Sequence, residues 1–118
     1  MYATKHSPLK EKSYSFALEI VKTYRMIAGQ QKEFVLSKQL LRSGTSVGAN
    51  IEEATQAESK ADFIHKLSLA NKEAFETHYW IRILRDTLYI DIEAAQNLLQ
   101  FCEELVKMLT ASIKTAKG

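Results

Sequence analysis

The chain has 118 residues, of which 46% are hydrophobic and 25% are charged, and its formal net charge at pH 7 is +2. A charge this small excludes an overwhelming electrostatic field for nucleic acid or for an anionic membrane surface. The length predicts one domain that spans residues 1–118.

Targeting and redox signals are absent from the sequence. Residues 1–12 are polar, without the apolar run of a signal peptide. No stretch approaches the roughly 18 apolar residues that a membrane span requires. Cys102 is the single cysteine, so no intrachain disulfide can form and a reducing compartment fits. We therefore expect a soluble, cytoplasmic protein.

Four segments carry apolar residues at helical spacing, namely residues 8–28, 33–58, 60–88 and 92–115. The chain contains one proline and four glycines, and this scarcity favours long uninterrupted helices. The connections are only a few residues long, which makes consecutive helices antiparallel neighbours. The sequence predicts an all-α fold, an up-down-up-down four-helix bundle.

Local signals mark the helix ends. Ser7 is a suitable N-cap in front of Pro8. The stretch from Ser59 to Asp62 is typical of a capping box, and Asp91 is an N-cap for the last helix. Gly29 is predicted to end the first helix.

Two helices carry more apolar residues than one core stripe needs. A second group on each helix lies away from its core stripe: Leu69, Trp80 and Ile83 on the third, and Tyr14, Leu18 and Val21 on the first. Apolar clusters on a second face are typical of burial against another chain. The alternative is a wide stripe that covers the sides of the bundle.

The second helix has unusually small residues. Gly44 and Gly48 are four positions apart on its inner side, where close packing against a neighbouring helix is the expected reason for them. The phosphate-loop pattern is absent, so we exclude that interpretation. Arg42 lies on the opposite side of this helix and can meet Glu73 or Glu76.

No set of residues indicates catalysis or a metal site. A di-iron bundle needs two Glu-x-x-His pairs, and the nearest match is a single Asp62–His65 pair on the polar side. His78 is interpreted as a core histidine, and Cys102 as a thiol within the apolar stripe of the fourth helix. We therefore predict no enzyme activity, no catalytic residue and no cofactor.

The N-terminal quarter has a positive excess. Its basic residues are Lys5, Lys10, Lys12, Lys22, Arg25 and Lys32. Repeated around a ring of subunits, they could form a surface for phosphate backbones. The alternative is an ordinary solvated helix face.

Several stretches together resemble a known family. They are residues 12–17 (KSYSFA), 39–53 (QLLRSGTSVGANIEE), 59–67 (SKADFIHKL), 72–74 (KEA) and 79–80 (YW). The chain is similar over nearly its whole length to the bacterial "four helix bundle protein" family. Its members were noticed as reading frames inside intervening sequences of large-subunit rRNA genes, hence an older ribosomal-protein label.

This resemblance implies an antiparallel bundle that assembles into a ring-shaped homopentamer. A related branch is the accessory protein of diversity-generating retroelements, which binds a reverse transcriptase and nucleic acid. The positions that match the family's packing and interface motif are Arg42, Gly44, Gly48, Asn50, Glu53, Glu73, Glu76 and Trp80.

Together, the residues and the resemblance lead to one expectation about function. It is a non-catalytic homo-oligomeric bundle that binds RNA or a nucleoprotein such as a reverse transcriptase. The alternative is a protein-interaction scaffold without a nucleic-acid role. Neither a membrane nor a small-molecule substrate is expected as a partner.

Overall fold

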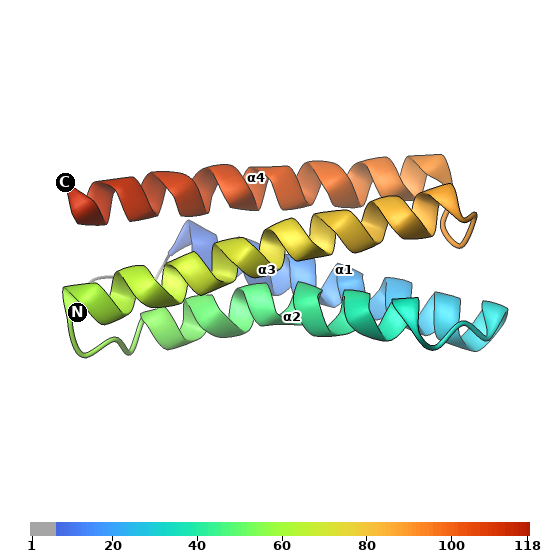
Figure 1. The fold of residues 1–118 in the computed structure, drawn as a ribbon, viewed down its shortest axis with the longest axis horizontal. Coiled ribbons are helices and arrows are strands. Elements are labelled where there is room, and N and C mark those ends of the chain that lie inside the picture. Colours follow the sequence, from blue (N-terminus) through green and yellow to red (C-terminus); the bar gives the residue numbers. More distant parts are fainter. Residues whose placement is uncertain (1–6) are drawn as a thin grey trace.

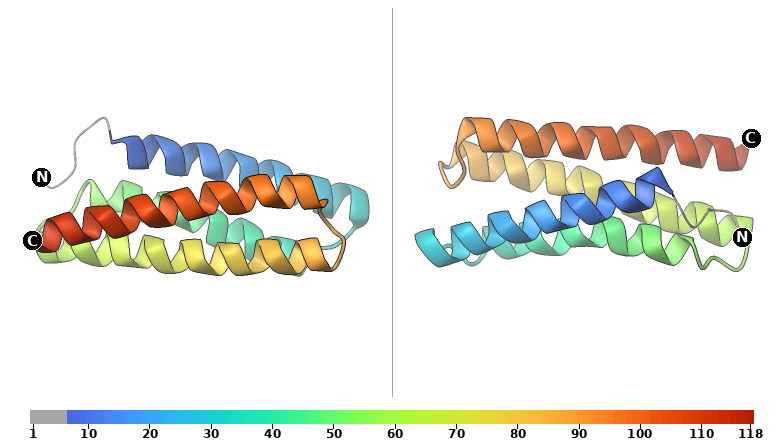
Figure 2. Two further views of the ribbon diagram at one scale, coloured as in Figure 1. Left: turned by 90° about the horizontal axis from the view of Figure 1, so that it is seen from above. Right: turned by 180° about the vertical axis from the view of Figure 1, so that it is seen from behind.

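A computed structural model describes residues 7–118, and this range is helical with short connections. Consecutive helices run in opposite directions along one long axis, so the predicted all-α up-down-up-down bundle is confirmed (Figures 1 and 2). The helices are α1 (Pro8–Gln31), α2 (Leu36–Ala54), α3 (Lys60–Asp86) and α4 (Ile92–Lys117).

Three helices begin at the caps that the sequence predicts. The Ser7 hydroxyl accepts a hydrogen bond from the backbone N–H of Lys10, and the Ser59 hydroxyl accepts one from Asp62. The Asp91 carboxylate accepts from Ala94 at 2.7 Å. Each bond satisfies an N–H that has no partner inside its own helix, and so fixes the first turn.

The start of α2 differs from the prediction, because the carboxylate of Glu33 acts as its cap. Its two oxygens accept hydrogen bonds from the N–H groups of Val35, Leu36 and Ser37 at 2.8–3.0 Å. Glu33 therefore lies before the helix and not in its first turn. α2 begins at Leu36, three residues later than predicted, and ends at Ala54 rather than at position 58.

The ends of α1 and α3 also differ from the prediction. α1 continues past Gly29 to Gln31, and the chain turns at Lys32, where φ is 56°. α3 ends at Asp86, two residues early, and Leu88 adopts φ 69°. In both cases the left-handed turn that usually follows a helix at glycine is made by a residue with a side chain. α4 extends two residues beyond the prediction, to Lys117.

Gly29 provides a first testable prediction. It lies at an exposed position within α1, and a Cβ built there meets no heavy atom within 4 Å. Gly29→Ala is therefore expected to raise the free energy of unfolding by about 1 kcal/mol, because alanine loses less backbone entropy in a helix. Urea denaturation followed by circular dichroism measures it. A loss of stability would contradict the helical assignment at this position.

The core follows the predicted stripes. α1 packs on α2, α2 on α3, and α3 on α4, whereas the contact between α1 and α4 is less extensive. Phe16, Ile20, Leu40, Ile81 and Leu105 are among the side chains with no exposed surface. α1 contacts α2 and α4, and so does α3, so α1 and α3 lie diagonally across the bundle. Their outward faces consequently point in opposite directions.

Candidate assembly surfaces

The two helix-two glycines lie against α1, but at different distances from it. A Cβ added at Gly44 would come within 2.7 Å of both γ-carbons of Ile20. At Gly48 the nearest atom is the carbonyl oxygen of Ser13, at 3.4 Å, which is an ordinary contact distance. Close approach of the helices therefore requires glycine only at Gly44.

A charged cluster joins the outer edges of α2 and α3. The Arg42 guanidinium forms ion pairs with Glu73, at 3.3 Å, and with Glu76. The indole N–H of Trp80 donates to the same Glu76 carboxylate at 2.9 Å. The bond from Trp80 holds the pKa of Glu76 below its usual value, against partial burial that raises it and together with the nearby Arg42. Glu76 thus stays ionised and orients both side chains.

Of the other two motif residues, Glu53 reaches α3, whereas the bond of Asn50 stays within α2. The Asn50 amide donates to the carbonyl of Ser46 within α2, and Glu53 accepts from Lys66 of α3 at 2.9 Å. Deeper in the same seam, the hydroxyls of Ser43 and Thr77 lie 3.0 Å apart and are fully buried. Apart from Asn50, the motif positions therefore lie where α2 meets α1 or α3.

The structure divides the predicted second faces into exposed and covered parts. Tyr14 and Leu18, one turn apart on α1, are 63% and 47% exposed. Leu69, Trp80 and Ile83 on α3 are only half-buried, and Trp80 packs against the core. For α3, the wide-stripe alternative is therefore the better description of these three residues.

Sequence reasoning missed the exposed apolar surface of α3. Phe75 and Tyr79, also one turn apart, are 60% and 49% exposed. The Tyr79 ring makes an edge-on contact with Trp80 at 5.2 Å, and Arg82 covers it at 5.7 Å. The i, i+4 spacing of two aromatic residues was the signal that could have found them.

We name the exposed pairs the α1 face (Tyr14 and Leu18) and the α3 face (Phe75 and Tyr79). Because α1 and α3 are diagonal, these faces lie on opposite sides of the bundle. They also differ in composition, so a contact between the α1 face of one copy and the α3 face of another would join two different surfaces.

The six basic residues do not share one surface. Lys5 lies outside the described residues. Lys10 pairs with Glu52 of α2, whereas Lys12 pairs with Glu104 of α4, so these two lysines point to opposite flanks of α1.

Farther along α1, Lys22 pairs with Glu19 of the same helix. Arg25 and Lys32 are exposed and make no ion pair with the described residues. Among the five described members of this set, Arg25 and Lys32 are therefore the ones without an ion pair, near the end of α1 and just after it.

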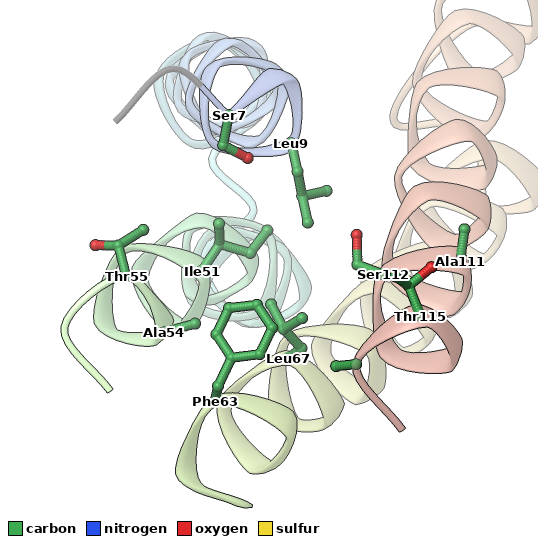
Figure 3. A pocket seen from close by; sticks show the side chains of 11 residues that line it. Ser7, Leu9, Ile51, Ala54, Thr55, Phe63, Leu67, Ala111, Ser112 and Thr115 are labelled. Carbon is green, nitrogen blue, oxygen red and sulfur yellow. The ribbon is translucent and has the colours of Figure 1, made fainter. Parts of the chain in front are cut away.

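A hollow of about 350 Å³ opens where the start of α1 and the end of α4 diverge (Figure 3). Leu9, Ile51, Phe63 and Leu67 form its apolar wall, and α4 contributes small residues such as Ala111. Its extent follows from the weak α1–α4 contact and from those small side chains.

The candidates for chemistry have structural partners. The Cys102 thiol is fully buried and donates to the carbonyl of Ala74, and burial, together with Glu103, raises the pKa of Cys102 to about 12. His78 is half-buried at the α3–α4 seam rather than in the core, with Glu103 at 2.9 Å and Arg82 donating to its other ring nitrogen. Within residues 7–118, no three His, Cys, Asp or Glu side chains gather closely enough to hold a metal ion.

Comparison with known proteins identifies the family. Residues 5–111 match the family described as 23S rRNA-intervening sequence protein. The chain belongs to this family. The resemblance found in the sequence is thereby confirmed, and the match covers every motif residue at the α2 and α3 seams.

A solved relative has the same fold. It is a protein of unknown function from the S23 ribosomal protein family of Bacteroides thetaiotaomicron, with 52% sequence identity and a TM-score of 0.89. The alignment covers 90% of this chain and 98% of that one. No curated protein matches the chain. None of the helices in residues 7–118 combines the length and apolar character needed to cross a bilayer.

Proposed function

We propose that the protein is a non-catalytic, cytoplasmic homo-oligomer whose subunits join side by side through the α1 and α3 faces. The observation that carries this proposal is the pair of exposed apolar faces on opposite sides of one bundle. Contact between two different faces is heterologous, and repeated heterologous contacts close into a ring when the rotation between subunits permits. A pentameric ring is the assembly that the family resemblance implies.

Charge variants of the two faces test this proposal. Leu18→Glu and Phe75→Glu each place a carboxylate in the apolar contact and are expected to lower the molar mass measured by light scattering. Ser15→Glu, at an exposed position beside the α1 face, is the matched control and should keep the wild-type mass.

Mixing the two variants distinguishes a heterologous contact from a symmetric one. Each variant retains the face that the other has lost, so one intact contact can form between them. The mass of the mixture should therefore exceed that of either variant alone. If the mixture behaves as the sum of its parts, or if wild type already has the mass of the variants, the proposed assembly is wrong.

We propose further that the assembled ring is an accessory protein for RNA or for a nucleoprotein such as a reverse transcriptase. The support is the exposed second half of α1, where Arg25 makes no ion pair with the described residues and Lys22 pairs only with Glu19 of the same helix. A ring repeats this surface once per subunit, and the attraction of phosphate backbones rises with each added contact. The rival proposal is a scaffold that binds only protein.

RNA binding predicts a specific effect of charge reversal. Lys22→Glu with Arg25→Glu is expected to weaken binding of a structured RNA and to lower the slope of log K against log salt by about 2. Gel-shift titration at several salt concentrations measures both quantities. The matched control is Lys107→Glu with Lys114→Glu, which makes the same charge change on exposed positions of α4. Equal losses in both variants, or binding that salt does not weaken, would favour the scaffold.

A further inference from the structure

The α1–α2 and α3–α4 connections lie at the same end of the bundle (Figure 1). This end exposes several large apolar side chains. We name it the double-loop end and define it by residues 32–35 and 87–92. Leu88, Ile92 and Val35 are 85%, 75% and 73% exposed, the highest values among the large apolar side chains in the described part of the chain. Phe34, at 49%, lies in the same connection as Val35.

Leu88 is the least expected residue at this end. Its N–H bonds to the carbonyl of Arg85, and the N–H of Tyr89 bonds to that of Leu84, which is the hydrogen-bond pattern of a Schellman motif. The motif places Leu88 at φ 69°, a conformation in which a Cβ crowds the backbone and glycine or asparagine is preferred. The side chain gains little burial in return, so leucine does not serve the stability of this chain.

The two connections are held side by side. The Gln31 side chain at the end of α1 donates to the carbonyl of Tyr89 at 2.6 Å. A groove of about 560 Å³ lies beside this bond, with Met26, Leu88 and Ile92 among its apolar lining. On the other connection, the Glu33 carboxylate fixes the backbone that presents Phe34 and Val35. One end thus carries both an apolar projection and an apolar groove.

This end also carries two charges of opposite sign that are unpaired among the described residues. Lys32, next to the projection, is exposed and makes no ion pair with the described residues. Glu93, next to the groove, is likewise exposed and without an ion pair there. The other two carboxylates here, those of Glu33 and Asp91, accept backbone N–H groups at the starts of α2 and α4. Lys32 and Glu93 are therefore the charged side chains of residues 32–35 and 87–93 that have no partner within the described chain, and they are of opposite sign.

We propose that the double-loop end is a second self-association site, where two copies meet end to end. Phe34 and Val35 of each copy enter the groove of the other, and Lys32 of each faces Glu93 of the other. Such a contact is isologous and therefore closes at two copies. It goes beyond the side-by-side assembly and does not depend on it, so it doubles whatever assembly the α1 and α3 faces make.

Leu88→Asn tests the contact without weakening the fold. Asparagine tolerates the left-handed conformation, so thermal unfolding should occur at the same or a higher temperature. The molar mass from light scattering should fall by half. The same halving is expected in the Leu18→Glu background, where the change is from dimer to monomer. If the side-by-side contact does not exist, Leu88→Asn should still halve the mass. If the mass is unchanged in both backgrounds, the end-to-end contact is wrong.

Charge exchange provides a second, independent test. Lys32→Glu and Glu93→Lys each place like charges opposite one another, and each should shift the mass toward half at low ionic strength. The double variant restores opposite charges and should restore the wild-type mass. If both single variants keep the wild-type mass, or if the double variant is no larger than they are, these residues do not meet across two copies.

Discussion

Gly44→Ala is expected to lower the free energy of unfolding by about 2 kcal/mol, although alanine is the better helix former by about 1 kcal/mol. The added Cβ would lie 2.7 Å from both γ-carbons of Ile20. Ile20 is fully buried and branched at Cβ, so rotation about χ1 exchanges its γ-carbons without removing them from the contact. Either α1 and α2 must separate or the core must shift. Urea denaturation measures the loss.

Gly48→Ala is the matched control, with the same chemical change one turn later on the same helix. Its Cβ meets the Ser13 carbonyl oxygen at 3.4 Å, so the variant should be as stable as wild type or more stable by up to about 1 kcal/mol. Combining Gly44→Ala with Ile20→Ala removes the clashing carbons. The combined loss should be smaller than the sum of the two single losses. Equal stability of Gly44→Ala and wild type would contradict the close approach.

The fold follows from the sequence because its determinants are local. Each helix carries an apolar stripe, and Ser7, Ser59 and Asp91 cap their helices through bonds that reach only three residues along the chain. Short connections then leave few topologies for four such helices. Neither step requires knowledge of which side chains meet across the bundle.

The helix ends that differ from the prediction depend on contacts between distant segments. Gly29 is a strong local stop signal, yet α1 continues for another two residues. Gln31, in its last turn, is held by the carbonyl of Tyr89, which is 58 positions away in the chain. The start of α2 depends on Glu33, a residue type that is not a preferred N-cap, so sequence statistics place it inside the helix.

Exposed faces were the least predictable feature, for a related reason. A helical projection gives the direction of Trp80 and of Phe75 relative to the core stripe, but not where the neighbouring helix ends. Trp80 lies toward α2, where Arg42 and Glu76 help to cover it. Phe75, at a different angle around α3, remains 60% exposed. The packing of the neighbouring helices, and not residue type, decides which aromatic ring stays exposed.

Glu33→Ala is expected to lower the free energy of unfolding by about 2 kcal/mol at neutral pH, because it removes the cap of α2. Three backbone N–H groups would lose their acceptor. One of them belongs to Ser37, which is fully buried and cannot turn to water instead. An unpaired buried donor carries most of the cost. Thermal or urea unfolding of the variant measures it.

The same cap predicts a pH dependence. Partial burial would raise the pKa of Glu33, but the hydrogen bonds from Leu36, Ser37 and Val35 outweigh it, so the pKa in the folded protein lies below the ordinary value of 4.5. The unfolded chain therefore binds this proton at a higher pH than the folded chain does. The stabilisation is fully present above pH 4.5 and is lost as the pH falls through the folded-state value.

Glu33→Gln isolates this contribution, because glutamine has the shape of protonated glutamate at every pH. Wild type should be more stable than the variant at neutral pH, and the difference should vanish in acid. Glu58→Gln, the same chemical change at an exposed position in the α2–α3 connection, is the control and should leave the stability at neutral pH close to that of wild type. A wild-type advantage that persisted in acid would mean that the geometry of the side chain, and not its charge, holds the first turn of α2.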